Sequence, residues 1–240
     1  MLYIVGIGGG SPEGMTGEAV SAIERSFLIV GYSVYNELLR PYFPDKKYFS
    51  TGMRQEKERV SFALEQAACG LEVALVCSGD AGVYGMASLA FELSESFPKV
   101  RIKVIAGVTA ALSGAALLGS PLTNDFAVIS LSDLLTPWEV IEKRLDCAAS
   151  GDLAIALYNP MSKKRTENLN RACGIILRHR SENTPCGIAV NIGREGEKTD
   201  ILTLGELQNA KVDMFTTVFA GNSVTRVIGG RLVTPRGYRL

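Results

Sequence analysis

The chain has 240 residues, and 47% of them are hydrophobic, which is enough for one large or two ordinary domains and excludes a generally disordered chain. Lysine plus arginine equals aspartate plus glutamate, and no basic stripe is interleaved with aromatic residues, so nucleic acid is not an expected partner. No apolar run reaches the roughly 20 residues that span a bilayer, and the chain opens on a core strand, so we expect a cytoplasmic protein without a membrane partner.

The first predicted strand runs directly into a glycine-rich loop, with the sequence YIVGIGGGSPEGMT from Tyr3 to Thr16. Glycine lets the backbone approach a ligand closely because it has no Cβ atom. A dinucleotide fingerprint needs a third glycine where Ser11 stands, and Pro12 disfavours helical geometry at Ser11, so Thr16 is the better helix start. The loop is therefore longer than a dinucleotide turn, and a tight connection without a ligand stays open as the alternative.

The second predicted strand, 27–30, is followed by Gly31, Tyr32 and Ser33. A nicotinamide enzyme places an acidic residue after this strand to bind a ribose hydroxyl, and none stands here. A nicotinamide-binding oxidoreductase therefore remains only an alternative.

Beyond this point short β-rich runs alternate with helical patterns, which predicts an α/β chain. The expected strands are 72–77, 101–105, 126–131, 153–158, 185–190 and 215–220. Apolar residues at three-four spacing predict helices over 60–68, with Gly70 as the cap, and over 169–177. Turn-favouring residues at 118–122 end an alanine-rich helix, so we expect two α/β domains, 1–119 and 120–240, with a ligand cleft between them.

The cysteines and the histidine limit the chemistry. The chain has five cysteines and no CxxC pair: Cys69, Cys77, Cys147, Cys173 and Cys186. Four of them lie in or beside apolar segments, which is typical of reduced cysteines in the core. His179 is the single histidine and lies at a polar helix end. We therefore expect no metal site and no histidine-based triad.

Two further small-residue loops follow predicted strands. The segment 78–87 reads SGDAGVYGMA, and Asp80 can either oppose a cationic ligand or cap the next helix. The segment 106–111 reads AGVTAA and also opens a helix. Three such loops at three strand ends predict a shared binding surface.

Taken together, these loops resemble the tetrapyrrole (corrin and porphyrin) methyltransferases, which use S-adenosylmethionine and fold as two α/β domains around a cleft, unlike the usual Rossmann methyltransferase. The resemblance covers nearly the whole chain. The matching segments are 6–16, 78–80, 82–84, 107–110, 192–195 and 203–204. The segments 125–126, 129–138, 158–160, 221–223 and 234–238 resemble the precorrin-3B C(17)-methyltransferase branch, including its anaerobic cobalt-factor III counterpart.

The resemblance implies S-adenosylmethionine as the cofactor, S-adenosylhomocysteine as its product, a tetrapyrrole substrate that carries cobalt in the anaerobic route, and a homodimer. The implied cofactor-binding residues are Gly79, Asp80, Val83, Thr109, Ala110, Leu157, Tyr158 and Ala220. The first loop is expected to face the tetrapyrrole through Gly8, Gly9, Gly10, Ser11 and Pro12. Another corrin-pathway methyltransferase and a non-catalytic tetrapyrrole carrier are the further alternatives.

A corrin precursor carries many carboxylates, so a neutral enzyme must supply local cations. The available loop cations are Arg54, Lys163, Lys164, Arg165 and Arg236, and we expect Lys163 and Lys164 to bind substrate. The alternative is that this charge run is a solvated helix start or lies at the rim of a dimer.

The implied reaction includes contraction of the ring, which can use a proton donor or acceptor. Asp133 and Ser132 are the candidate catalytic residues. The alternative, favoured for Ser132, is that 132–137 caps a helix beginning near Trp138.

Overall fold

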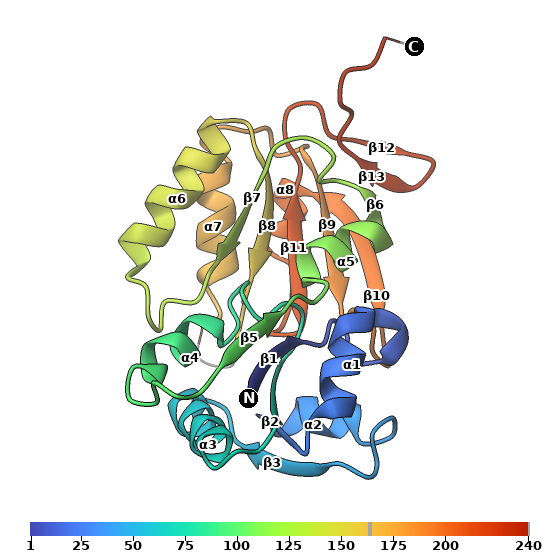
Figure 1. The fold of residues 1–240 in the computed structure, drawn as a ribbon. Helices are drawn as coiled ribbons and strands as arrows, with labels where there is room; N and C mark the ends of the chain where they lie inside the picture. The colour runs from blue at the N-terminus through green and yellow to red at the C-terminus, as the bar shows by residue number, and fades with distance from the viewer. Residues whose placement is uncertain (163–164, 240) are drawn as a thin grey trace. The chain divides into compact units, whose positions relative to one another are not determined.

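A computed structural model describes residues 1–162 and 165–239 (Figure 1). Backbone contacts divide the chain into two compact units, Met1–Ala110 and Ala111–Leu240. The structure thus divides the chain at the start of helix α5 (Ala110–Leu118), whereas the sequence analysis placed the division after it. The physical reason is that Ala111, Ala115 and Leu118 pack into a core of the second unit.

The first unit is built on a parallel five-stranded sheet of order β3-β2-β4-β1-β5. Its strands are β1 (Leu2–Gly6), β2 (Leu28–Tyr32), β3 (Lys47–Thr51), β4 (Val73–Cys77) and β5 (Ile102–Ile105). Its helices are the short 3-10 helix η1 (Pro12–Gly14), α1 (Gly17–Arg25), α2 (Ser33–Leu39), α3 (Glu56–Ala68) and α4 (Ala87–Ser94). Because every strand runs the same way, all the loops that follow the strands lie along one edge of the sheet, the edge formed by the carboxyl ends of the strands.

Both faces of this sheet are buried, which explains the continuous apolar runs in β1 and β4. Leu2 and Ile4 face α3 and α4, whereas Tyr3 and Val5 face α1 and α2. The predicted helix start at Thr16 is confirmed, because its side chain accepts a hydrogen bond from the Ala19 amide at 3.1 Å.

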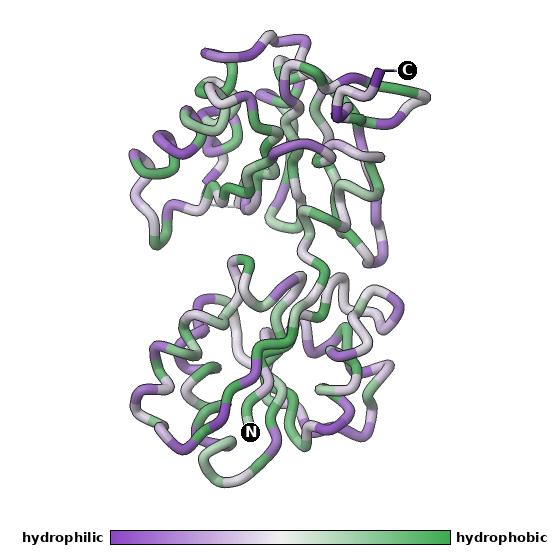
Figure 2. The backbone as a smooth tube through the Cα atoms, turned by 45° about the horizontal axis from the view of Figure 1, so that its top comes forward, coloured by the Kyte–Doolittle hydropathy of each residue, from purple (hydrophilic) through white to green (hydrophobic). Residues whose placement is uncertain are grey.

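The second unit contains a mixed sheet of order β10-β9-β11-β8-β7, in which only β7 and β8 are parallel. These strands are β7 (Phe126–Ser130), β8 (Ala154–Tyr158), β9 (Pro185–Val190), β10 (Lys198–Thr203) and β11 (Thr216–Ala220). Helices α6 (Trp138–Ser150), α7 (Asn168–Ile176) and α8 (Leu204–Leu207) cover one face, and α5 covers the other. A small sheet is formed by β6 (Gly119–Ser120), β12 (Arg226–Ile228) and β13 (Arg231–Val233). Hydrophobic and hydrophilic segments alternate along the backbone in both units (Figure 2).

Among the described residues, no helix is long and apolar enough to cross a membrane. The same residues contain no group of three or more His, Cys, Asp or Glu side chains that could hold a metal ion.

The cysteines are all free, but the expectation that four of them are core residues is wrong. Cys77, Cys173 and Cys186 are buried, whereas Cys69 and Cys147 are exposed because they lie at the end of α3 and on the outer side of α6. Burial raises the pKa of Cys77 to about 11 and the pKa values of Cys173 and Cys186 to about 12.

This difference predicts the thiol reactivity of the folded protein. At about pH 8 Cys69 and Cys147 should react with a disulfide reagent, while the buried thiols stay protonated and shielded. Titration of the native protein should therefore release two equivalents rapidly, and titration after denaturation should release five. Rapid reaction of a third thiol in the native protein would contradict this assignment.

Candidate functional site

The three glycine-rich loops of the first unit meet at the carboxyl ends of β4, β1 and β5, which are neighbours in the sheet. The Gly8 amide donates to the Gly79 carbonyl at 3.0 Å, and the Gly79 amide donates to the Gly8 carbonyl at 2.9 Å. The loops after β1 and β4 are thus paired like a short piece of antiparallel sheet.

Glycine is required where these backbones approach most closely. A Cβ atom on Gly107 would lie 2.1 Å from the Gly79 carbonyl oxygen, and one on Gly6 would lie 2.7 Å from the Gly107 nitrogen. These contacts are with backbone atoms, which cannot turn away as a side chain could. The sequence therefore places glycine at strand ends that only glycine can occupy.

Asp80 joins two of the loops through its carboxylate. Its Oδ1 accepts hydrogen bonds from the amides of Gly82 at 2.8 Å and Val83 at 3.1 Å, and its Oδ2 accepts one from the Gly107 amide at 2.8 Å. The alternative that Asp80 caps the next helix is wrong, because α4 begins at Ala87 with Met86 at the N-cap position. Asp80 instead fixes the loop after β4 against the loop after β5.

The structure brings together the residues of the first unit that were predicted to bind cofactor: Gly79, Asp80, Val83, Thr109 and Ala110. A Cβ atom on Gly79 would lie 3.5 Å from the Thr109 Cα atom and 3.6 Å from the Ala110 nitrogen. Gly79 has a positive φ of 65°. The result is a surface made largely of backbone atoms, which a flat or extended ligand can approach closely.

The residues predicted to face the tetrapyrrole form the turn after β1. Gly8 and Gly10 are buried, whereas Gly9, Ser11 and Pro12 are partly exposed. Ser11 is the N-cap residue of the short helix η1, and the Gly10 amide donates to the Ile7 carbonyl at 2.9 Å. The other two predicted substrate residues, Lys163 and Lys164, lie outside the residues that the structure describes.

The predicted residues of the second unit do not all lie together. Leu157 and Tyr158 end β8, where the Tyr158 hydroxyl oxygen accepts a hydrogen bond from the Ala111 amide at 2.7 Å. Ala220 ends β11, which is antiparallel to β8, and it pairs with Ile155. The side chains of Leu157 and Ala220 are buried in the same core, so only their backbone atoms are available to a ligand.

Ser132 and Asp133 lie just beyond β7 beside a cation from a later segment. Arg165 donates from Nη1 to the Ser132 hydroxyl, and the same nitrogen is 3.7 Å from Asp133 Oδ1. Capping of α6 by Ser132 is wrong, because the N-cap residue is Pro137 and no side chain caps this helix. The sequence analysis named Arg165 only as a loop cation and did not connect it with Ser132 and Asp133.

Asn159 extends this polar group, and the sequence analysis gave it no role beyond its place in a matching segment. Its side-chain amide donates to the Ser130 hydroxyl at 3.0 Å, and its backbone has a positive φ of 53°. Asparagine is one of the few residues that tolerate this conformation, and this is the signal that a sequence could offer. The segments after β7 and β8 are therefore joined by side-chain bonds.

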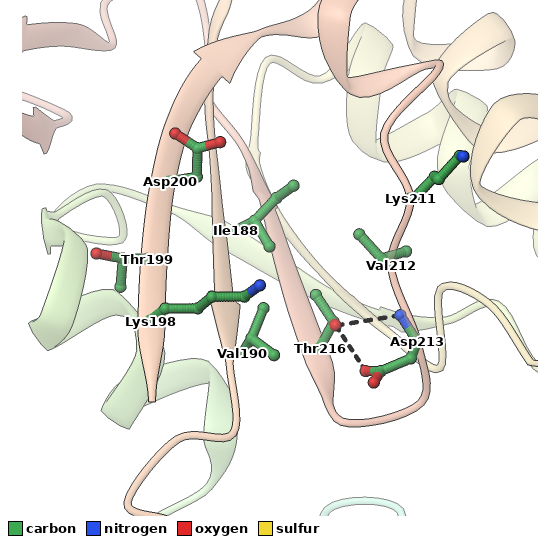
Figure 3. Close-up of a pocket in the computed structure, with 9 residues that line it drawn as sticks. All are labelled: Ile188, Val190, Lys198, Thr199, Asp200, Lys211, Val212, Asp213 and Thr216. Atoms are coloured by element: carbon green, nitrogen blue, oxygen red, sulfur yellow. Dashed lines mark hydrogen bonds between the residues drawn. The ribbon is translucent and has the colours of Figure 1, made fainter. Parts of the chain in front are cut away.

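A separate cavity of about 460 Å³ lies against β9, β10 and β11 in the second unit (Figure 3). Its lining mixes apolar and charged side chains: Ile188, Val190, Lys198, Thr199, Asp200, Lys211, Val212, Asp213 and Thr216. Among the lining residues, the Thr216 hydroxyl donates to Asp213 Oδ1 at 2.9 Å (Figure 3). None of the predicted cofactor or substrate residues lines this cavity.

The fold and the loops define a class of protein: two α/β units, the first with glycine-rich loops at the carboxyl ends of a parallel sheet. A dinucleotide-binding fold places its first strand beside its second, whereas here β4 lies between β1 and β2. The family Tetrapyrrole (Corrin/Porphyrin) Methylases matches residues 1–208. The chain belongs to this family, and it is a methyltransferase.

Individual relatives agree with this assignment. The chain is 45% identical to a probable cobalt-factor III C(17)-methyltransferase of Salmonella typhimurium over 100% of both chains. It is 38% identical to a precorrin-3B C(17)-methyltransferase of Sinorhizobium sp, covering 95% of this chain and 91% of that one. The crystal structure of the methyltransferase CobJ superposes with a TM-score of 0.89 at 36% identity, over 98% of this chain and 99% of that chain. Two other relatives are longer, and the chain spans 45% and 52% of their lengths.

Proposed function

We propose that this protein transfers a methyl group from S-adenosylmethionine to carbon 17 of a corrin precursor, either cobalt-factor III or precorrin-3B, coupled to ring contraction in cobalamin biosynthesis. The observation that carries the proposal is the junction of the three glycine-rich loops through Asp80, in a chain whose full-length relatives bear these names. When bound, S-adenosylmethionine supplies an electrophilic methyl group.

The residues fit such a cofactor because the glycine positions bring the loop backbones close together without Cβ atoms between them. Gly79, Val83, Thr109 and Ala110 would hold it in the first unit. Asp80 acts through position, since each of its carboxylate oxygens already accepts backbone hydrogen bonds. Holding two reactants in line can contribute roughly 7 to 11 kcal/mol in favourable cases, so loop rigidity is central to the proposed activity.

Binding of S-adenosylhomocysteine or of NAD separates this proposal from the alternatives. Calorimetric titration should show that the purified protein binds S-adenosylhomocysteine and does not bind NAD. Binding of NAD would favour an oxidoreductase, and binding of a tetrapyrrole without S-adenosylhomocysteine would favour a carrier. Either result would contradict the proposed function.

Asp133 is proposed to move a proton during ring contraction, with Ser132 beside it. Asp133→Asn should lower turnover by about 100-fold, because general acid-base catalysis contributes roughly that much or more, while leaving the affinity for S-adenosylhomocysteine unchanged. Single-turnover assays at saturating substrate measure the first effect, and calorimetry measures the second.

Glu142→Gln is the matched control, since Glu142 is also paired with an arginine, Arg178, at 3.1 Å on the outer side of the same unit. It should leave turnover and affinity unchanged. Normal product formation by Asp133→Asn would remove the proton-transfer role.

We also propose that the protein is a cytoplasmic homodimer, as the resemblance to the tetrapyrrole methyltransferases implies. Light scattering of the purified protein should give twice the chain mass of 25.8 kDa. A monomer at the protein concentration of the methyl-transfer assay would contradict the dimer.

A further inference from the structure

A tight turn follows β3 at the same edge of the first sheet as the glycine-rich loops. Arg59, from α3, is buried and holds this turn: its Nε donates to the Thr51 hydroxyl and its Nη2 donates to the Gly52 carbonyl, each at 2.8 Å. The Gly52 amide donates to Gln55 Oε1 at 2.6 Å. The turn is therefore fixed from both sides.

The fixed turn presents two exposed side chains, Met53 and Arg54. Met53 is 51% exposed, although it is a large apolar residue. Arg54 is exposed and has no ion pair among the described residues, whose ion pairs all involve other side chains. An apolar side chain beside a free cation suits a ligand that has both an apolar ring and carboxylates.

The backbone conformation at Arg54 disfavours arginine. Arg54 has a positive φ of 66°, a conformation that residues with a Cβ atom adopt at a cost of roughly 1 to 2 kcal/mol. It also lies just before α3, which begins at Glu56, and the amino-terminal end of a helix disfavours cations. Glycine would avoid both costs, and a contact outside the folded chain would account for arginine at this position.

The sheet order gives the distance from this turn to the first loop. Three strand spacings of about 4.8 Å separate β3 from β1, so the two strand ends lie roughly 14 Å apart. A macrocycle placed over Ser11 and Pro12 would extend its peripheral carboxylates along this edge. A ring that extends from Ser11 past β4 and β2 would reach the turn that carries Met53 and Arg54.

We propose that Arg54 binds a carboxylate side chain of the tetrapyrrole, that Met53 contacts the ring, and that Arg59 and Gln55 are positioning residues for this turn. This inference rests on the proposed function and assigns part of its substrate site to the loop after β3. A bidentate arginine-carboxylate contact fixes the orientation of the ring as well as its affinity.

The test is an absorbance titration of the protein with cobalt-factor III and, in parallel, with precorrin-3B. Arg54→Gly should weaken tetrapyrrole binding by about tenfold, as expected for loss of a charge-assisted contact. Its affinity for S-adenosylhomocysteine should stay within about twofold of wild type. Its melting temperature should be equal or higher, because glycine relieves the positive φ. A merely structural Arg54 would instead give a lower melting temperature.

Lys57→Ala is the matched control, because it removes an equal charge from an exposed residue in the first turn of α3. Tetrapyrrole affinity should be unchanged in this variant. Unchanged affinity in Arg54→Gly, or an equal loss in Lys57→Ala, would overturn the inference while leaving the proposed function intact. Failure of the wild-type protein to bind either cobalt-factor III or precorrin-3B would overturn both.

Discussion

Gly107→Ala is expected to lower the free energy of unfolding by about 3 kcal/mol and to abolish binding of S-adenosylhomocysteine. The new Cβ atom would lie 2.1 Å from the Gly79 carbonyl oxygen and 2.6 Å from the Gly6 carbonyl carbon. Because all these atoms belong to the backbone, the loops after β1, β4 and β5 must separate to make room. Urea denaturation followed by circular dichroism measures the loss of stability, and calorimetry measures the loss of binding.

Gly17→Ala is the control for this substitution. Gly17 begins α1, and a Cβ atom there would meet nothing within 4 Å. Alanine has a higher helix propensity than glycine, so the variant should be as stable as wild type or more stable by up to about 1 kcal/mol. Wild-type stability and binding in Gly107→Ala would show that the three strand ends do not approach as closely as described.

Asp80→Ala is expected to reduce the affinity for S-adenosylhomocysteine by about 100-fold, with a loss of about 2 kcal/mol in the free energy of unfolding. The substitution leaves the amides of Gly82, Val83 and Gly107 without their acceptor. The site is partly exposed, so water can replace some of these bonds, and the larger effect falls on loop geometry. Calorimetry and urea denaturation again separate the two effects.

Asp213→Ala provides the comparison, because Asp213 holds a turn of the second unit in a similar way. Its Oδ1 accepts from the Phe215 amide and the Thr216 hydroxyl, each at 2.9 Å. This variant should lose stability without losing affinity. An equal affinity for S-adenosylhomocysteine in Asp80→Ala and wild type would remove Asp80 from the cofactor site.

The sequence predicted the buried part of the fold well. Each expected strand is present, with ends that differ by a residue or two, because apolar runs such as 73–77 are buried on both faces. The strands β3 and β10 were not predicted, because their sequences, KYFST and KTDILT, are rich in polar residues and lack the apolar run that marks a strand. The other edge strands of these two sheets, β5 and β7, are more apolar and were predicted. The short strands β6, β12 and β13 were also not predicted.

The meeting of the three glycine-rich loops could be predicted from the sequence, but the hydrogen bonds that join them could not. Parallel strands bring the loops after β1, β4 and β5 to one edge, so a shared surface could be expected from the order of elements. The acceptor role of Asp80 toward Gly107, and the contact of Arg165 with Ser132, join residues that are far apart in sequence. Local patterns left a helix cap open for Asp80 and favoured one for Ser132, because both residue types are common helix caps.

The most direct test of the proposed function is the position of the transferred methyl group. The protein would be incubated in separate reactions with cobalt-factor III and with precorrin-3B, each with S-adenosylmethionine that carries a carbon-13 methyl group, and the products analysed by nuclear magnetic resonance. We predict a labelled methyl group on carbon 17 of a contracted ring from one of the two substrates. A label on a different carbon, or no transfer to either macrocycle, would contradict the proposed function.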